Sequence, residues 1–257
     1  MRLSAFNVLL ISSLMSLYCS LSSAADLSFT LGNQVLENKA LKARLKASEF
    51  DITILKRNLA NQKNLTQAAI VDKASVIRNG LWPKNPTISV CWENPSPDNL
   101  HGRELVKNIV AETWGKESGV TFENWKVCES TSQGIRIKIA DVGPHVKRLG
   151  QHLDGMKNGM ELNFTFNNWS PSCKDTLDDC IKFIAAHEFG HALAFTHEQN
   201  RPDTPPECND RQGTDGDYQV TLYDSESIMN YCNPRWNNYG QLSSKDIEAI
   251  HQLYGKP

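Results

Sequence analysis

The stretch HEFGHALAFTH, residues 187–197, decides the fold and the chemistry expected of this 257-residue chain. His187 and His191 lie four residues apart, so on a helix their imidazoles point the same way, about one turn apart. That spacing suits two ligands of one tetrahedral Zn²⁺ ion. His197 supplies a third ligand if the helix ends soon after His191 and the chain doubles back.

Glu188 lies between the first two histidines but is turned about 100° away from His187. It is therefore a poor ligand and a good candidate base for activating a water molecule. Three histidines leave a fourth zinc position for water or substrate, which is typical of catalytic zinc and not of structural zinc. The alternative is a helix with surface histidines. The segment SIMNY, residues 227–231, favours zinc ligation over surface histidines.

Residues 187–203, HEFGHALAFTHEQNRPD, resemble the zinc signature of metzincin proteases, and the astacin-like branch is the most similar. SIMNY resembles the astacin-type Met-turn. Glu198, Arg201 and Asp203 match residues that follow the third histidine in astacin-like members. Leu81-Trp82-Pro83 and the closing residues 242–255 resemble the edges of astacin or matrixin catalytic domains, so the resemblance covers roughly residues 80–257.

This resemblance implies an α+β, metzincin-like zincin domain with a twisted mixed sheet, a zinc helix and a C-terminal helix. It implies an exported zinc-dependent endopeptidase that holds one Zn²⁺ per chain and acts on protein or peptide substrates. Tyr231 would bind zinc in the resting enzyme and then stabilise the oxyanion, the alternative being a buried core tyrosine. Met229 would form an apolar floor. Glu198 would pair with a new N-terminus after propeptide removal, or be a surface carboxylate.

Ala194 departs from the family pattern, which has glycine three residues after the second histidine. That glycine lets the helix end in a left-handed turn, a conformation that costs a non-glycine residue about 1 kcal/mol or more. Zinc coordination is worth on the order of 10 kcal/mol in structural sites, so we expect His197 to remain a ligand.

Residues 1–25 are expected to be a secretory signal peptide. Arg2 precedes an apolar, serine-rich run, and small residues follow at Ser22-Ser23-Ala24-Ala25. A membrane anchor is the alternative, but the run is short and interrupted by serines. We therefore expect a secreted protein, extracellular or periplasmic, with no stable membrane insertion after signal removal.

Six cysteines remain after the signal peptide, and an even number in an exported chain favours disulfides. Six cysteines allow fifteen connectivities. We expect Cys173–Cys180 to close a loop before the zinc helix and Cys208–Cys232 to join the loop after it to the Met-turn. Cys91 and Cys128 are then left as a pair. Cysteine ligation of zinc is the rival, but no CxxC spacing is present.

The charge is unevenly distributed along the chain. Residues 26–78 hold nine Lys/Arg and five Asp/Glu, whereas residues 79–257 hold seventeen and twenty-four. Leu41, Leu45, Ile52, Leu55 and Leu59 follow helical spacing. Residues 26–78 are expected to be either a helical propeptide docked on the acidic catalytic domain of residues 79–257, or a coiled-coil spacer. Nucleic acid is not expected as a partner, because no basic stripe with interleaved aromatics occurs.

Alternation and turn residues predict the elements of residues 79–257. We expect a helix from Asp98 or Asn99 to about Ser118, with Leu105, Ile109 and Trp114 facing the core. The substrate-binding edge strand is expected within residues 146–153 or residues 160–166. The remaining expected elements are strands 87–92, 121–127, 135–140 and 160–166, a zinc helix that begins with Asp178 and Asp179, and a last helix opened by a capping box at Ser243 to Asp246.

Two other functions remain open. One is a zinc-containing binding or adhesion protein that no longer turns over, favoured by Ala194 but opposed by the intact Glu188. The other is a zinc amidase acting on cell-wall peptides, which would use the same chemistry. His101, His145, His152 and His251 have no partner at ligand spacing and are expected to be ordinary residues.

Overall fold

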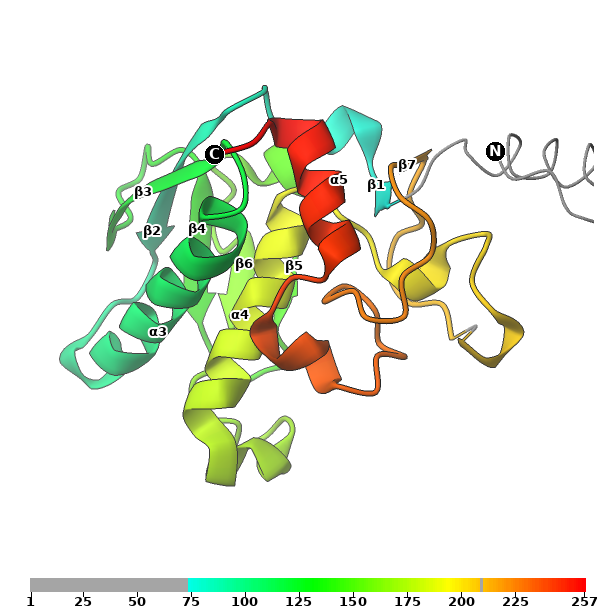
Figure 1. Ribbon diagram of the computed structural model, residues 1–257. Coiled ribbons are helices and arrows are strands. Elements are labelled where there is room, and N and C mark those ends of the chain that lie inside the picture. The colour runs from blue at the N-terminus through cyan, green and yellow to red at the C-terminus, as the bar shows by residue number, and fades with distance from the viewer. Residues whose placement is uncertain (1–73, 209) are drawn as a thin grey trace, which may run out of the picture. The chain divides into compact units, whose positions relative to one another are not determined.

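The computed structural model describes residues 74–208 and 210–257 (Figure 1). The signal peptide and the leucine stripe of the N-terminal segment lie outside the described residues. The central element is a five-stranded sheet of order β3-β2-β4-β6-β5. Its strands are β2 (Thr87–Trp92), β3 (Thr121–Val127), β4 (Ile135–Ile139), β5 (His145–Val146) and β6 (Met160–Leu162).

Four strands of this sheet are parallel, and only β5 runs antiparallel to its neighbour β6. β5 is therefore an edge strand. The prediction that residues 160–166 form an edge is wrong, because β6 lies between β4 and β5. β6 also ends four residues early: the Asn163 Oδ1 atom accepts the backbone N–H groups of Thr165 and Phe166 and turns the chain out of the sheet.

The helix after β2 is shorter than expected. α3 spans Leu100–Val110 and continues as a single π-helical stretch, Ala111–Gly115. Its fully buried face is Gly102, Val106, Val110 and Trp114, whereas Leu105 and Ile109 are only partly buried. Trp114 is buried as expected, but the two earlier positions are wrong by one residue, since Val106 and Val110 are buried in place of Leu105 and Ile109 and Gly102 has no side chain to mark that face. A Cβ there would lie 2.6 Å from the Phe164 ring.

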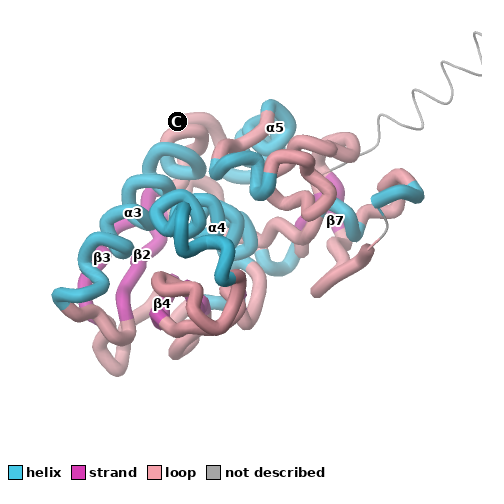
Figure 2. Tube along the Cα trace, turned by 90° about the horizontal axis from the view of Figure 1, so that it is seen from below, coloured by secondary structure: helices cyan, strands magenta, loops and turns pink. Residues whose placement is uncertain are grey.

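The zinc helix α4, Leu177–Ala192, packs beside α3, and both cover one face of the sheet (Figures 1 and 2). Phe189 of α4 stacks on Trp125 and meets Phe122 edge-on, both from β3. α5, Ser244–Tyr254, begins with the expected capping box between Ser243 and Asp246. None of the helices in the described part of the chain is long and apolar enough to span a bilayer.

A two-stranded sheet joins the start of the described chain to the loop beyond the zinc helix. β1 (Ser75–Val76) pairs antiparallel with β7 (Tyr218–Gln219), and Val76 also bridges to Phe195. Ala74, Ser75 and Val76 are buried. Residues 74–78, which the sequence assigns to the N-terminal segment, thus pack inside the same unit as the sheet and the zinc helix.

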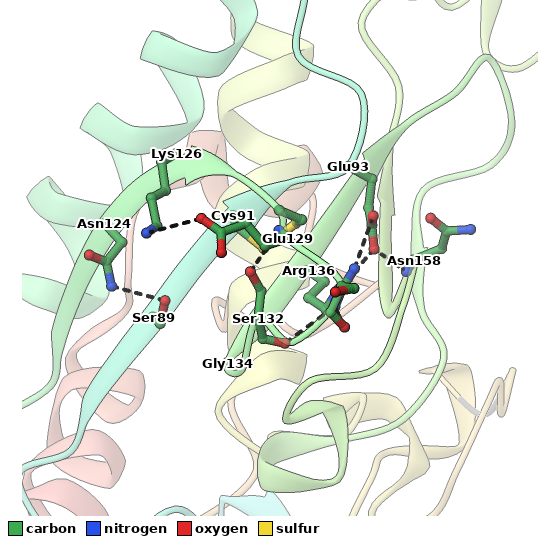
Figure 3. Close-up of a disulfide and its surroundings, with 12 residues drawn as sticks. Ser89, Cys91, Glu93, Asn124, Lys126, Glu129, Ser132, Gly134, Arg136 and Asn158 are labelled. Carbon is green, nitrogen blue, oxygen red and sulfur yellow. Dashed lines mark hydrogen bonds and ion pairs between the residues drawn. A yellow bond between two sulfur atoms is a disulfide. The ribbon is translucent and has the colours of Figure 1, made fainter.

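All three expected disulfides form: Cys91–Cys128, Cys173–Cys180 and Cys208–Cys232. Figure 3 shows the first, which ties β2 to the residue after β3. Beside it, the buried Arg136 pairs with Glu93 at 2.9 Å. Burial alone would raise the pKa of Glu93, but hydrogen bonds from Arg136 and the Asn158 N–H hold it below its usual value.

Seven short 3₁₀ turns complete the described chain. They are Arg78–Gly80, Pro97–Asn99, Gly150–Leu153, Pro171–Thr176, Glu198–Asn200, Pro206–Cys208 and Trp236–Gly240.

Candidate metal centre

The zinc helix ends immediately after its second histidine. Ala194 has φ +72°, the left-handed conformation expected for the missing glycine. The Phe195 N–H donates to the Gly190 carbonyl and the Ala194 N–H to the His191 carbonyl, both at 3.0 Å. These two bonds form a Schellman turn. The chain therefore doubles back as expected, and His197 returns toward α4 although alanine occupies the turn.

Each of the three histidines is oriented by a backbone carbonyl. The Nδ1 atoms lie 2.8 Å from the carbonyl oxygens of Ile228 (for His187), Phe195 (for His191) and Gln212 (for His197). A carbonyl can only accept, so each Nδ1 carries the proton and donates it. Each Nε2 atom then presents a lone pair, which is the tautomer that a metal ion requires.

The three Nε2 atoms converge on one point. His197 Nε2 lies 3.3 Å from His187 Nε2 and 3.1 Å from His191 Nε2. Lone pairs at that separation repel one another and cannot form hydrogen bonds. Nitrogen ligands of a tetrahedral zinc ion, at about 2.0–2.1 Å from the metal, lie about 3.3 Å apart. The histidine cluster therefore fits one zinc ion, and the described residues contain no other such group of His, Cys, Asp and Glu.

The electrostatic environment keeps the imidazoles neutral. Burial lowers the pKa of His187 to about 3, with a further contribution from His197, and lowers the pKa of His191 well below its usual value. Burial also lowers the pKa of His197. Neutral imidazoles are the form that binds metal, so the site is ready for a cation without first losing protons.

Glu188 lies beside the histidines with one oxygen free. Its side chain is buried, and its Oε2 atom has no hydrogen-bond partner among the described residues. Burial raises the pKa of Glu188 to about 8. The carboxyl group lines the cleft together with His191 and His197. A buried carboxyl oxygen without a partner, next to a metal-ligand set, is placed to bind a water molecule.

Tyr231 and Met229 come to the site from the Met-turn. The Tyr231 ring centre lies 4.3 Å from that of His197 and 5.5 Å from that of His187, and Tyr231 is 49% exposed. The alternative of a buried core tyrosine is therefore wrong. Met229 is 1% exposed and packs beneath the helix at Gly190, where a Cβ would lie 2.4 Å from its sulfur.

His191 and His197 line a cleft of about 420 Å³. The lining also includes the edge strand β5 with the residues that follow it, and Tyr231, Gly213 and Thr214. His145 and His152, expected to be ordinary residues, line this cleft. Sequence gives no signal for this, because their position depends on where β5 joins the sheet.

Glu198 has partners within the chain. It is buried, its Oε1 atom accepts the Asp224 N–H at 2.9 Å, and it lies 3.2 Å from the Arg201 Nε atom. Arg201 is fully buried and also pairs with Asp203 at 2.7 Å. The alternative of a surface carboxylate at position 198 is wrong. The Glu198 N–H donates to the Met229 carbonyl, so this network joins the third histidine to the Met-turn.

Comparison with known proteins agrees with a zinc site. The chain is 23% identical over 218 residues to zinc metalloproteinase dpy-31 of Teladorsagia circumcincta, covering 71% of this chain and 33% of the relative. It is 26% identical over 171 residues to the protein of that name from Haemonchus contortus, covering 52% and 29%. The relatives of this chain are zinc metalloproteinases. The chain spans about a third of their length.

A solved structure shares the fold. Myroilysin superimposes with a TM-score of 0.53 and 23% identity, over 71% of this chain and 99% of myroilysin. No family model matches the chain. The α+β, metzincin-like fold predicted from the sequence is confirmed, as is the resemblance to astacin-like zinc metalloproteases.

Proposed function

We propose that this chain is an exported zinc endopeptidase, with His187, His191 and His197 holding the metal and Glu188 and Tyr231 acting on the substrate. The convergence of three Nε2 lone pairs beside the unpartnered Oε2 of Glu188, in an open cleft, supports this best. A site that only stores zinc needs no base and no cleft. The intact Glu188 therefore disfavours a non-catalytic binding protein.

The chemistry divides between the metal and the protein. When bound, zinc supplies Lewis acidity, which lowers the pKa of water and polarises the substrate carbonyl. Glu188 Oε2 accepts the proton of the attacking water and passes it to the nitrogen of the leaving amine. The Tyr231 hydroxyl donates a hydrogen bond to the oxyanion of the tetrahedral intermediate. The edge strand β5 offers its free side to an extended peptide.

Casein hydrolysis by the purified protein tests this function. Cleavage should stop with a chelator and return when zinc is added back. Incubation with cell-wall material separates the amidase alternative, which predicts release of amino groups from the cell wall and intact casein. Binding of one zinc per chain with no hydrolysis of either material would leave the non-catalytic alternative.

We further propose that residues 1–25 direct export and that the N-terminal segment up to residue 73 is a removable propeptide. Three disulfides in the described chain favour an oxidising compartment. The buried β1 strand supports a removal point before Ala74, because cleavage beyond it would take away backbone partners of β7 and Thr196.

A further inference from the structure

The third histidine is oriented by the carbonyl of an exposed residue, whereas the carbonyls that orient the other two belong to buried residues. The Phe195 carbonyl that orients His191 belongs to the turn ending α4. The Ile228 carbonyl that orients His187 is in the Met-turn, where the Ile228 N–H is bound by Asp246. The Gln212 carbonyl that orients His197 lies in an exposed stretch without helix or strand. Something must hold that peptide group in place.

Asn200 binds both polar groups of Gln212. Its Nδ2 atom donates to the Gln212 carbonyl at 2.8 Å, and its Oδ1 atom accepts the Gln212 N–H at 2.9 Å. Nδ2 also lies 3.3 Å from the Thr214 carbonyl. Asn200 is 3% exposed, so its carboxamide is held inside the protein while it binds the exposed Gln212. Because the carboxamide pairs with the donor and the acceptor of one residue, it fixes that residue's rotation as well as its position.

We propose that Asn200 is a positioning residue for the metal site: it holds the Gln212 carbonyl so that the His197 imidazole keeps its Nε2 lone pair directed at the other two histidines. The Gln212 oxygen accepts from Asn200 Nδ2 and His197 Nδ1, each at 2.8 Å, and so uses both of its lone pairs. This inference rests on the proposed zinc site, and it adds a residue that contacts neither metal nor substrate.

Removing the Asn200 side chain leaves the Gln212 peptide free to turn toward solvent. His197 would then lose a fixed acceptor, and its imidazole would sample orientations in which Nε2 points away from the cluster. Partners that orient metal-bound histidines are typically worth 10- to 100-fold in metal affinity. Asn200 acts one step further out, so we expect the lower end, about 10-fold.

The test compares Asn200→Ala and Asn200→Ser with Asn163→Ala as the matched control. Asn163 is also buried, and its side chain also binds backbone N–H and carbonyl groups, but at the end of β6. Zinc affinity is measured by chelator competition. The geometry of the metal site is followed by the visible absorption of the Co²⁺-substituted proteins, and the stability of the metal-free proteins is measured by denaturation. Both Asn200 variants should bind zinc about 10-fold more weakly and alter the Co²⁺ spectrum. The control should lose stability without either effect.

The outcomes separate this inference from the proposed function. If the unaltered chain binds no zinc or cleaves no protein, the proposed function itself is rejected. If the unaltered chain binds zinc tightly and both Asn200 variants bind it equally tightly, only the role of Asn200 is overturned. Failure of both variants to fold when metal-free would also overturn it, because Asn200 would then be a structural residue. Recovery of kcat at high free zinc, with unchanged KM, is the expected companion result.

Discussion

The Cβ atom of Ala194 lies against Gly150, and a Cβ added to that glycine would come within 2.7 Å of it. A Cβ on Gly80 would lie 3.5 Å from the same methyl group. Ala194 is fully buried. Gly150 thus makes room for the methyl group at the position where the metzincin pattern has glycine, whereas a Cβ on Gly80 would make only an ordinary contact with it. The turn that returns His197 to the site is therefore buried in the core.

Replacing Ala194 with glycine should change stability by less than about 1 kcal/mol. Relief of the positive φ favours glycine by about 1–2 kcal/mol. Loss of a buried methyl group costs about 0.8 kcal/mol, and the greater freedom of the unfolded chain costs about 0.5–1 kcal/mol. Ala194→Val should lose far more, because a branched side chain is strained at this φ and has no space. Denaturant midpoints measure both, and a loss above about 2 kcal/mol in the glycine variant would contradict this balance.

Sequence predicted the fold where local pattern and long-range packing agree. The bounds of Thr87–Trp92 and Thr121–Val127 match those of β2 and β3, because both runs are rich in β-branched and aromatic residues and are bounded by turn residues. Prediction failed where a single side chain overrode the pattern. Asn163 ended β6 by binding the following N–H groups, and Gly102 hid the buried face of α3.

In the candidate site, too, local pattern predicts some residues and long-range packing brings in others. His187, Glu188 and His191 follow from helix geometry alone, which is local. The carbonyls of Gln212 and Ile228 that orient the histidines lie 15 and 41 residues away in sequence. Any residue type can supply a carbonyl, so no sequence signal marks them. His145 and His152 were missed for a related reason, since the sheet and not the spacing brings them to the cleft.

Glu188→Gln should retain one zinc per chain and lose catalysis by about 10²–10⁴-fold. Glutamine keeps the shape of the side chain but has no carboxylate to accept the water's proton. Metal content is measured by atomic absorption, and kcat/KM with a fluorescent peptide. Glu248→Gln is the control, because that carboxylate is exposed on α5, outside the cleft lining. A Glu188→Gln variant with more than a few per cent of normal activity would reject Glu188 as the base.

Tyr231→Phe should lower kcat about 10- to 100-fold while metal content stays unchanged, as expected for a lost oxyanion donor at the milder end of its range. The ring packing against His197 is retained in phenylalanine, so a loss must come from the hydroxyl group. Tyr239→Phe, also an exposed tyrosine, is the control. Unchanged kcat would show that Tyr231 only shields the histidines.

A chain beginning at Ala74 should be more active than one beginning at Asp26, if residues 26–73 cover the cleft. Residues 26–73 added as a separate peptide should inhibit it, and less strongly at high salt, because part of the attraction is electrostatic. A chain beginning at Asn79 is the informative control. It lacks the Ser75 carbonyl that accepts the Thr196 N–H at 2.8 Å, so it should lose both stability and zinc affinity. Equal activity of the Asp26 and Ala74 chains would favour a spacer or coiled-coil role.

Asp246 connects the last helix to the Met-turn and should make stability depend on pH. Its carboxyl group accepts from Ser227 Oγ at 2.7 Å, the Ile228 N–H at 3.0 Å and the Ser243 N–H at 2.9 Å. Burial is the largest influence and raises its pKa to about 6 despite these bonds. An aspartate in the unfolded chain has a pKa of about 3.9. Between pH 4 and 6 the unfolded chain therefore releases this proton while the folded chain keeps it.

Stability from this group is greatest below about pH 4 and falls as pH rises to about 6, by roughly 3 kcal/mol for a shift of about two units. Asp246→Asn removes that titration and little volume, so its free energy of unfolding minus that of the unaltered chain should rise by roughly 3 kcal/mol from pH 4 to pH 7. Both proteins are measured metal-free, since zinc binding itself changes with pH. The difference cancels the titrations of groups that Asp246 does not influence. A difference that is constant across this range, or that falls, would show that the hydrogen bonds outweigh burial.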